Sequence, residues 1–128
     1  MKNIEIGAEG QVTMQTTPDH TAASVGNPGV EVLGTAALIV FFEDAAHHCL
    51  LPYFDVGEIS LGTTVNIKHL AAATAGSQII AKAVLLSQEK NNLNFSVKVW
   101  HKDRLLMKGE HGRAVVQLNK FLSAVKAL

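Results

Sequence analysis

Between Gly34 and Pro52 an unbroken apolar run is followed by charged residues, and the pattern predicts one helix. Every residue from Ala36 to Phe42 is apolar, which leaves no polar face over two turns. A helix that is apolar on all sides is buried. Thr35 is a competent N-cap, and Pro52 ends the helix because it lacks an N–H and restricts the preceding residue. We therefore expect a buried central helix of about 17 residues, roughly 25 Å long.

Glu43 and Asp44 follow the apolar run while the helix continues. A carboxylate carried into a core by its own helix costs several kcal/mol unless partners compensate its charge. Such a group is either stabilised by its neighbours or used in chemistry. Glu43 is therefore our first candidate for a catalytic side chain. The charged residues also make the segment too polar, and its length too short, to span a membrane.

After residue 57 the pattern changes to a period of two, which predicts strands. Alternating segments separated by turn residues cover 58–70, 76–88, 93–100 and 105–116, and a weaker alternation covers 10–16. Residues 17–34 are rich in glycine and proline and are predicted to be loop. Residues 119–128 are predicted to close the chain with a short helix.

One buried helix followed by antiparallel strands predicts an α+β domain in which the sheet covers the helix. This is the pattern of a hot-dog fold, a curled antiparallel β-sheet wrapped around one long central helix. The length of 128 residues fits a single domain over 1–128. A long apolar edge strand needs a partner, so we expect a dimer with a continuous sheet.

Composition narrows the class of protein. Hydrophobic residues make up 48% of the chain, which indicates a globular protein. The lone cysteine, Cys49, excludes an internal disulfide and favours a reducing compartment, so we expect the cytoplasm. Met1 to Gly10 show no apolar segment of a secretory signal. A net charge of zero argues against a nucleic-acid binder.

The charge is unevenly distributed. Residues 1–64 contain one basic and eight acidic residues, and residues 65–128 contain ten basic and three acidic ones. Either the two halves pack against each other or pair between subunits, or the basic half forms a surface for an anionic ligand such as a phosphorylated cofactor.

A possible site combines the helix with the first long strand. His69 shares a strand face with Val65 and Ile67, so its imidazole should point toward the helix and can meet Glu43. Thr35 lies eight residues before Glu43, two helical turns away. A hydroxyl, a carboxylate and an imidazole in an apolar pocket suit acyl transfer or hydrolysis. Spacing alone favours the simpler interpretation, a core histidine and a helix-capping threonine.

Carboxylate–histidine pairs on the helix also raise the question of a metal. Glu43 is followed by His47, and Asp44 by His48, each four residues on, and Asp44 is three residues before His47. A carboxylate metal site needs the three-residue spacing on a second helix as well, and only one such pair is present. We therefore expect ion pairs on the helix surface and no metal. Cys49 is expected to be a core residue.

Two strand positions have open interpretations. Gly62 could bring a backbone N–H to a substrate carbonyl, or it could mark a bulge. Glu110 to Arg113 place an imidazole and a guanidinium on one strand face, which is either part of a site or a solvated edge.

Several motifs resemble those of the fluoroacetyl-CoA thioesterase-like family of hot-dog proteins, and the resemblance runs from about Val25 to Phe121. They are V-L-G-T-A at 32–36, Glu43 followed by Ala45-Ala46, L-G-T-x-V-x-I-x-H-L-A at 61–71, Gly76, and G-x-H-x-R at 109–113. Their order and separations match the family pattern without a shift.

The resemblance implies an acyl-CoA thioesterase acting on a short or small acyl group, with CoA as part of the substrate and no separate cofactor. It places Thr35, Glu43 and His69 at catalytic positions and Gly62 and Arg113 at positions lining the acyl or CoA site. It also implies a homodimer, or a higher oligomer, with its site at the subunit interface. The basic half would receive the CoA phosphates. The alternatives are a hot-dog hydratase or dehydratase and a non-catalytic acyl-CoA-binding protein.

Overall fold

Five antiparallel strands form one sheet in the order β1-β3-β4-β5-β2 in the computed structural model, which describes residues 1–128. The strands are β1 (Glu9–Gln15), β2 (Glu58–His69), β3 (Gln78–Glu89), β4 (Asn92–His101) and β5 (Arg104–Gln117). All predicted strands are present, the weak first one included. The turns that join β3 to β4 and β4 to β5 place Lys90 and Lys102 in the left-handed region, at φ 56° and 52°.

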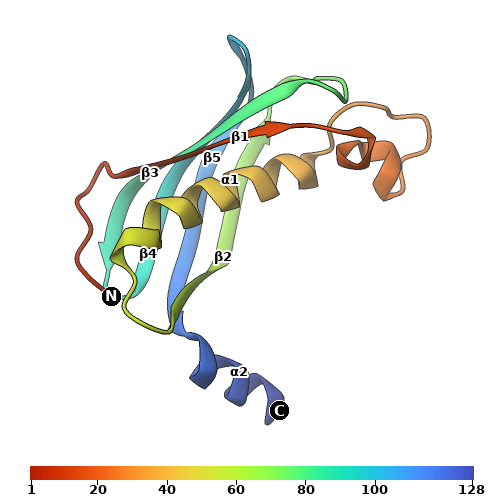
Figure 1. The fold of residues 1–128 in the computed structure, drawn as a ribbon. Helices are drawn as coiled ribbons and strands as arrows, with labels where there is room; N and C mark the ends of the chain where they lie inside the picture. The colour runs from red at the N-terminus through yellow and green to blue at the C-terminus, as the bar shows by residue number, and fades with distance from the viewer.

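The long helix α1 (Thr35–Leu50) lies against one face of this sheet (Figure 1). The core forms between them from the inward side chains of the strands and from one side of the helix, including Leu38, Phe42 and Leu50, all fully buried. The close packing of β1 depends on Gly10, because a Cβ there would overlap the backbone of Ala45 and lie 2.7 Å from the Cys49 nitrogen. The α+β arrangement of a sheet around one central helix is as predicted.

The helix differs from the prediction on one side. Thr35, Ala36 and Val40 are exposed, and Val40 keeps 52% of its surface open. The apolar run therefore does not mean burial on all sides within one chain. Instead it gives α1 an open apolar stripe that leads along the helix to Glu43.

Short helical turns occupy the connections on both sides of α1. They span Pro18–His20, Ala22–Val25 and Leu51–Tyr53. The closing helix α2 (Leu118–Lys126) continues directly from β5, has no buried residue and points away from the sheet (Figure 1). None of the helices has the length and hydropathy needed to cross a membrane.

Candidate functional site

The start of α1 and the end of β2 bring a threonine and a histidine together. The N-cap residue is Gly34 rather than the predicted Thr35, so Thr35 is the first helical residue. Its hydroxyl is thereby free, and Thr35 Oγ1 lies 2.8 Å from Nδ1 of His69. The backbone keeps the two elements in place, because Leu33 N donates to the carbonyl of Ala73 just beyond β2, at 2.8 Å. The predicted capping threonine is therefore a hydrogen-bond partner of His69.

Glu43 lies in the middle of α1 and faces two side chains of β5. Its Oε2 is 3.4 Å from Nη1 of Arg113 and 3.9 Å from Nε2 of His111. The carboxylate is not deeply buried, since its side chain is 36% exposed. It sits at the rim of the core, with buried partners on one side and open space on the other.

Arg113 is held in one orientation by β2. Its Nε donates to Ser60 Oγ at 2.8 Å and its Nη2 to the Ser60 carbonyl at 2.9 Å. Only 7% of its surface is exposed. Burial lowers the pKa of Arg113 from its usual value, and the charge of Glu43 opposes that shift. Since Glu43 provides the nearby carboxylate, the two groups form a partly buried ion pair.

His111 is a neutral link in this network. It is fully buried, and its Nδ1 lies 2.8 Å from the carbonyl of Thr64, which requires a proton on that nitrogen. Nε2 is then free to accept from Nη1 of Arg113, 3.1 Å away. Burial lowers the pKa of His111, and the Arg113 charge lowers it further. The solvated-edge interpretation of residues 110–113 is therefore wrong for the two inward-facing residues, His111 and Arg113.

Gly62 brings the β2 backbone against the carboxylate. A Cβ at this position would lie 2.5 Å from Oε2 of Glu43 and 3.2 Å from Cε1 of His111. The strand register also shifts between Gly62 and Thr64, so the bulge interpretation is confirmed. The approach of a backbone N–H to a substrate carbonyl stays a prediction. With Glu43 in its observed position, a side chain at residue 62 would displace the carboxylate.

The structure thus assembles the predicted site residues in two clusters. Thr35 and His69 form one, and Glu43, Gly62 and Arg113 form the other. Glu43 makes no contact with His69 within the chain, contrary to the expected meeting, because eight helical residues separate Thr35 from Glu43 by about 12 Å.

One residue of the network, Ser60, was missed by sequence reasoning. Ser60 Oγ, which accepts from Arg113, also lies 3.0 Å from Nδ1 of His47. His47 therefore contacts Ser60 and not Glu43, the residue with which it was predicted to pair. His48 likewise contacts the backbone carbonyl of Asp44, at 2.8 Å, and not its carboxylate. The prediction of helix-surface ion pairs is therefore wrong. The available signal was Ser60 itself, a polar residue at an inward position of β2.

The remaining candidates lie outside this network. No group of three or more His, Cys, Asp or Glu side chains in the structure could hold a metal ion. Cys49 is buried in the core as predicted, and burial raises the pKa of its thiol.

Comparisons with known proteins agree with this architecture. Residues 16–119 match the family described as fluoroacetyl-CoA-specific thioesterase. The fluoroacetyl-CoA thioesterase of Streptantibioticus cattleyicolor is 33% identical over 96 residues, which cover 75% of this chain and 69% of that protein.

Solved structures show the same fold. The fluoroacetyl-CoA thioesterase FlK superposes with a TM-score of 0.91 at 27% identity, covering 98% of each chain. A variant of FlK in complex with acetyl-CoA gives a TM-score of 0.92 at 27% identity, covering 97% of this chain and 98% of that one. A hot-dog-like protein from Thermanaerovibrio acidaminovorans, at 20% identity and a TM-score of 0.86 over 95% and 90% of the chains, shares the fold. The chain therefore belongs to the fluoroacetyl-CoA-specific thioesterase family and has its hot-dog fold.

Proposed function

We propose that this protein hydrolyses a small acyl-CoA thioester to the free acid and CoA. The observation that carries the proposal is the carboxylate of Glu43 and its pairing with Arg113. It is held by a buried guanidinium beside a backbone that has no side chain, and its other side is open. Membership of a thioesterase family makes a thioester the substrate of choice for such a group.

Each site residue has a role that its position allows. Glu43 either attacks the thioester carbonyl or takes a proton from an attacking water. Arg113 orients the carboxylate and balances its charge. A backbone N–H near Gly62 stabilises the negative charge that develops on the carbonyl oxygen. His69, hydrogen-bonded to Thr35, delivers a proton to the sulfur as the C–S bond breaks. Water supplies the oxygen of the free acid, either by direct attack or by hydrolysing the acyl–Glu43 intermediate, and the proton that it gives up restores His69.

The close approach of β2 favours a small acyl group. A single Cβ at Gly62 would already contact the Glu43 carboxylate, so the reacting carbonyl has little room beside it. A short chain such as acetyl or fluoroacetyl fits this limit better than a long acyl chain does.

We further propose that the working unit is a homodimer. One chain presents the two halves of the site about 12 Å apart along α1. β2 pairs only with β5 and leaves its other edge open, and the apolar stripe through Ala36 and Val40 is uncovered. A second copy on this side could set Glu43 beside Thr35 and His69 of the partner subunit. The lone cysteine supports a reducing compartment such as the cytoplasm.

The decisive experiment is a thiol-release assay over a panel of acyl-CoAs that includes acetyl-CoA and fluoroacetyl-CoA. Hydration of crotonyl-CoA is measured in parallel. We expect CoA release from the short members and no hydration. Hydration without thiol release would show a hydratase, and binding of acyl-CoA with neither reaction would show a non-catalytic binding protein.

A further inference from the structure

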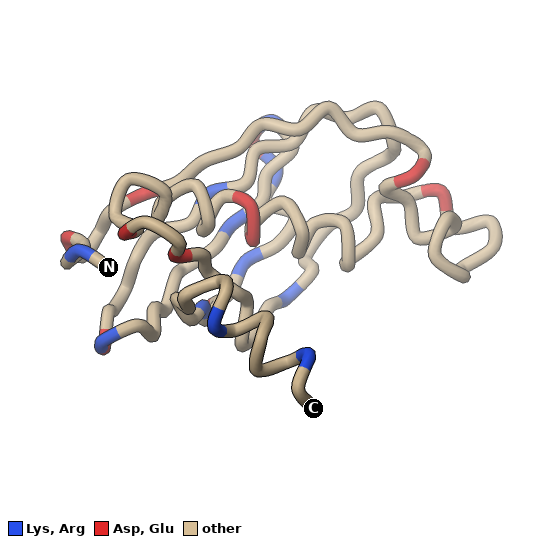
Figure 2. The backbone as a smooth tube through the Cα atoms, turned by 60° about the horizontal axis from the view of Figure 1, so that its bottom comes forward, with Lys and Arg blue, Asp and Glu red and all other residues tan.

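Four lysines form a straight row across the sheet. Lys82 of β3 is directly opposite Lys98 of β4, which is opposite Lys108 of β5, which is opposite Lys68 of β2. These four strands are consecutive neighbours, so the row crosses them without a gap. At about 4.8 Å between strands it spans roughly 14 Å. Several basic positions lie together on the sheet in Figure 2.

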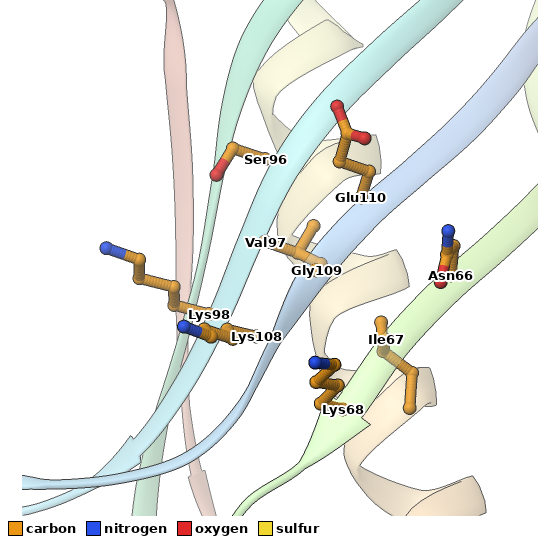
Figure 3. Close-up of a pocket in the computed structure, with 9 residues that line it drawn as sticks. All are labelled: Asn66, Ile67, Lys68, Ser96, Val97, Lys98, Lys108, Gly109 and Glu110. Atoms are coloured by element: carbon orange, nitrogen blue, oxygen red, sulfur yellow. The ribbon is translucent and has the colours of Figure 1, made fainter.

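The row lies on the face of the sheet that α1 does not cover. Figure 3 shows the side chains of Lys68, Lys98 and Lys108 in front of the strands, with the helix behind them. Strand alternation agrees, because the neighbours Val97 and Met107 are buried toward the helix. Lys68 also directly precedes His69, so the row begins one residue away from the candidate site, on the opposite face.

The arrangement is electrostatically unfavourable by itself. Like charges directly opposite each other destabilise a sheet. Lys82 has one carboxylate partner, Glu9, at 3.1 Å, and the other three lysines form no salt bridge. An anionic ligand would relieve this repulsion. A second copy packed symmetrically on the face would instead bring lysines against lysines.

The surface around the row is shaped for a ligand. A groove of about 330 Å³ lies between Lys68, Lys98 and Lys108, with the backbone of Gly109 in its lining. Glu110 lies on the same groove and accepts from Asn94 Nδ2 at 3.2 Å.

A second groove of about 260 Å³ adjoins the row at its other end. Lys82, Lys98, Val84 and Trp100 line it, so an indole lies beside the ammonium groups. A line of cations next to an aromatic ring suits a ligand that carries several phosphates and a flat base.

We propose that this lysine row binds the phosphates of a nucleotide, with the base against Trp100. Two sources supply that chemistry: the nucleotide end of a CoA thioester, in which case the inference rests on the proposed function, and a free nucleotide acting as an effector. Arg113, the other basic residue near the site, is not free to bind a phosphate, because it is buried and occupied by Ser60 and Glu43.

The test compares two double variants with equal loss of charge. Lys98→Ala with Lys108→Ala removes the centre of the row, and Lys120→Ala with Lys126→Ala removes two exposed lysines of α2. Binding of adenosine 3′,5′-bisphosphate is measured by titration calorimetry at low and moderate salt. We expect affinity to fall about tenfold in the row variant only, with a weaker salt dependence. Loss of like-charge repulsion should leave its thermal stability equal or higher.

Kinetics then separate the two sources. Both variants are assayed with acetyl-CoA and with acetyl-pantetheine, which lacks the nucleotide. If the KM of the row variant is raised for acetyl-CoA but not for acetyl-pantetheine, the row binds the nucleotide end of the substrate. Weaker bisphosphate binding with an unchanged KM assigns it to a free nucleotide. Equal bisphosphate affinity and equal KM in wild type and row variant would overturn the proposal. A wild type that binds the bisphosphate but cleaves neither thioester would overturn the proposed function and leave the lysine site standing.

Discussion

The guanidinium of Arg113 has one orientation toward Glu43, because its Nε and Nη2 both donate hydrogen bonds to Ser60. A buried guanidinium without a counter-charge is costly, so Glu43 serves the fold as well as the proposed chemistry. The pair ties the middle of α1 to the sheet. For a substitution of Arg113 or Glu43, the free energy of unfolding and the turnover therefore have to be measured separately.

Glu43→Gln keeps the volume of the side chain and removes its charge. Turnover of the best acyl-CoA should drop by at least about 100-fold, the scale for a nucleophile or general base. The free energy of unfolding should fall, because Arg113 stays buried without a counter-charge. Thiol-release kinetics and urea denaturation measure the two effects. Asp44→Asn, one residue along and exposed, is the control, and near-normal turnover of Glu43→Gln would end the catalytic role.

Ser60→Ala tests the support of the arginine. The change removes the acceptor of Arg113 Nε and the partner of His47 Nδ1. Leaving the buried guanidinium and the half-buried imidazole without this partner should lower the free energy of unfolding by about 1 to 3 kcal/mol. Turnover should fall as well, because Arg113 no longer holds Glu43 in place. Ser87→Ala, at an exposed position of β3, should change neither quantity, and a Ser60→Ala protein with unaltered kinetics would contradict the positioning role.

At the scale of elements, glycines in β2 and β5 set how closely backbone approaches its neighbours. Gly62 borders the movable end of the Glu43 side chain, whereas Gly109 borders the backbone of β2 at Asn66 and Ile67. Substitution by alanine should therefore affect mainly the activity at Gly62 and mainly the stability at Gly109.

Gly62→Ala should push the Glu43 carboxylate away from Arg113 and lower kcat/KM by at least about tenfold. The fold should tolerate it, because a flexible side-chain end can move. Gly109→Ala should instead lower the melting temperature, since the backbone it meets cannot yield. Thermal unfolding and kinetics of both variants check the contrast. A Gly62→Ala protein that is destabilised but fully active when folded would refute it.

At the scale of the whole molecule, the candidate site residues of one chain lie in two separate clusters. The proposed dimer would join one cluster of each subunit into a complete active site. Light scattering should give a mass of about twice 13.7 kDa. The proposed dimer makes a sharper prediction. Glu43→Gln and His69→Ala proteins, each inactive, should regain about a quarter of wild-type activity when unfolded, mixed and refolded together. Half of the dimers are then mixed, and each mixed dimer has one intact site. No recovery would place the whole site within one chain.

Stability should also depend on pH through two histidines, the half-buried His47 and the fully buried His111. Burial lowers the pKa of both His47 and His111. In the unfolded chain these groups take up protons near pH 6.5, whereas in the folded protein they do so only at lower pH. The free energy of unfolding should therefore decrease as pH falls below about 6.5, because the unfolded state binds more protons.

Urea denaturation between pH 7.5 and 5 measures this slope. His111→Gln should flatten it whatever its effect on absolute stability, and replacement of the exposed His48 by Gln should not. An unchanged slope in His111→Gln would show that the buried imidazole does not contribute.

Much of the fold followed from the sequence alone. Period-two alternation marked every strand, because side chains of a sheet with one covered face must alternate. The apolar run up to Phe42 marked α1, and the inserted charge marked Glu43. The family resemblance, and not periodicity, suggested Thr35, His69, Gly62 and Arg113 as site residues. These features depend on neighbours in the chain, which the sequence displays directly.

Only the tertiary structure decided which side chains meet. Periodicity gives the face of a residue but not its position along a partner element, so it paired Glu43 with His69 rather than with Arg113. The registers of four strands, not any local pattern, align Lys68, Lys82, Lys98 and Lys108. Burial of His111 and Arg113 likewise depends on α1 covering β5. Such contacts join residues far apart in sequence, and the physical reason they form is the packing of the whole sheet on one helix.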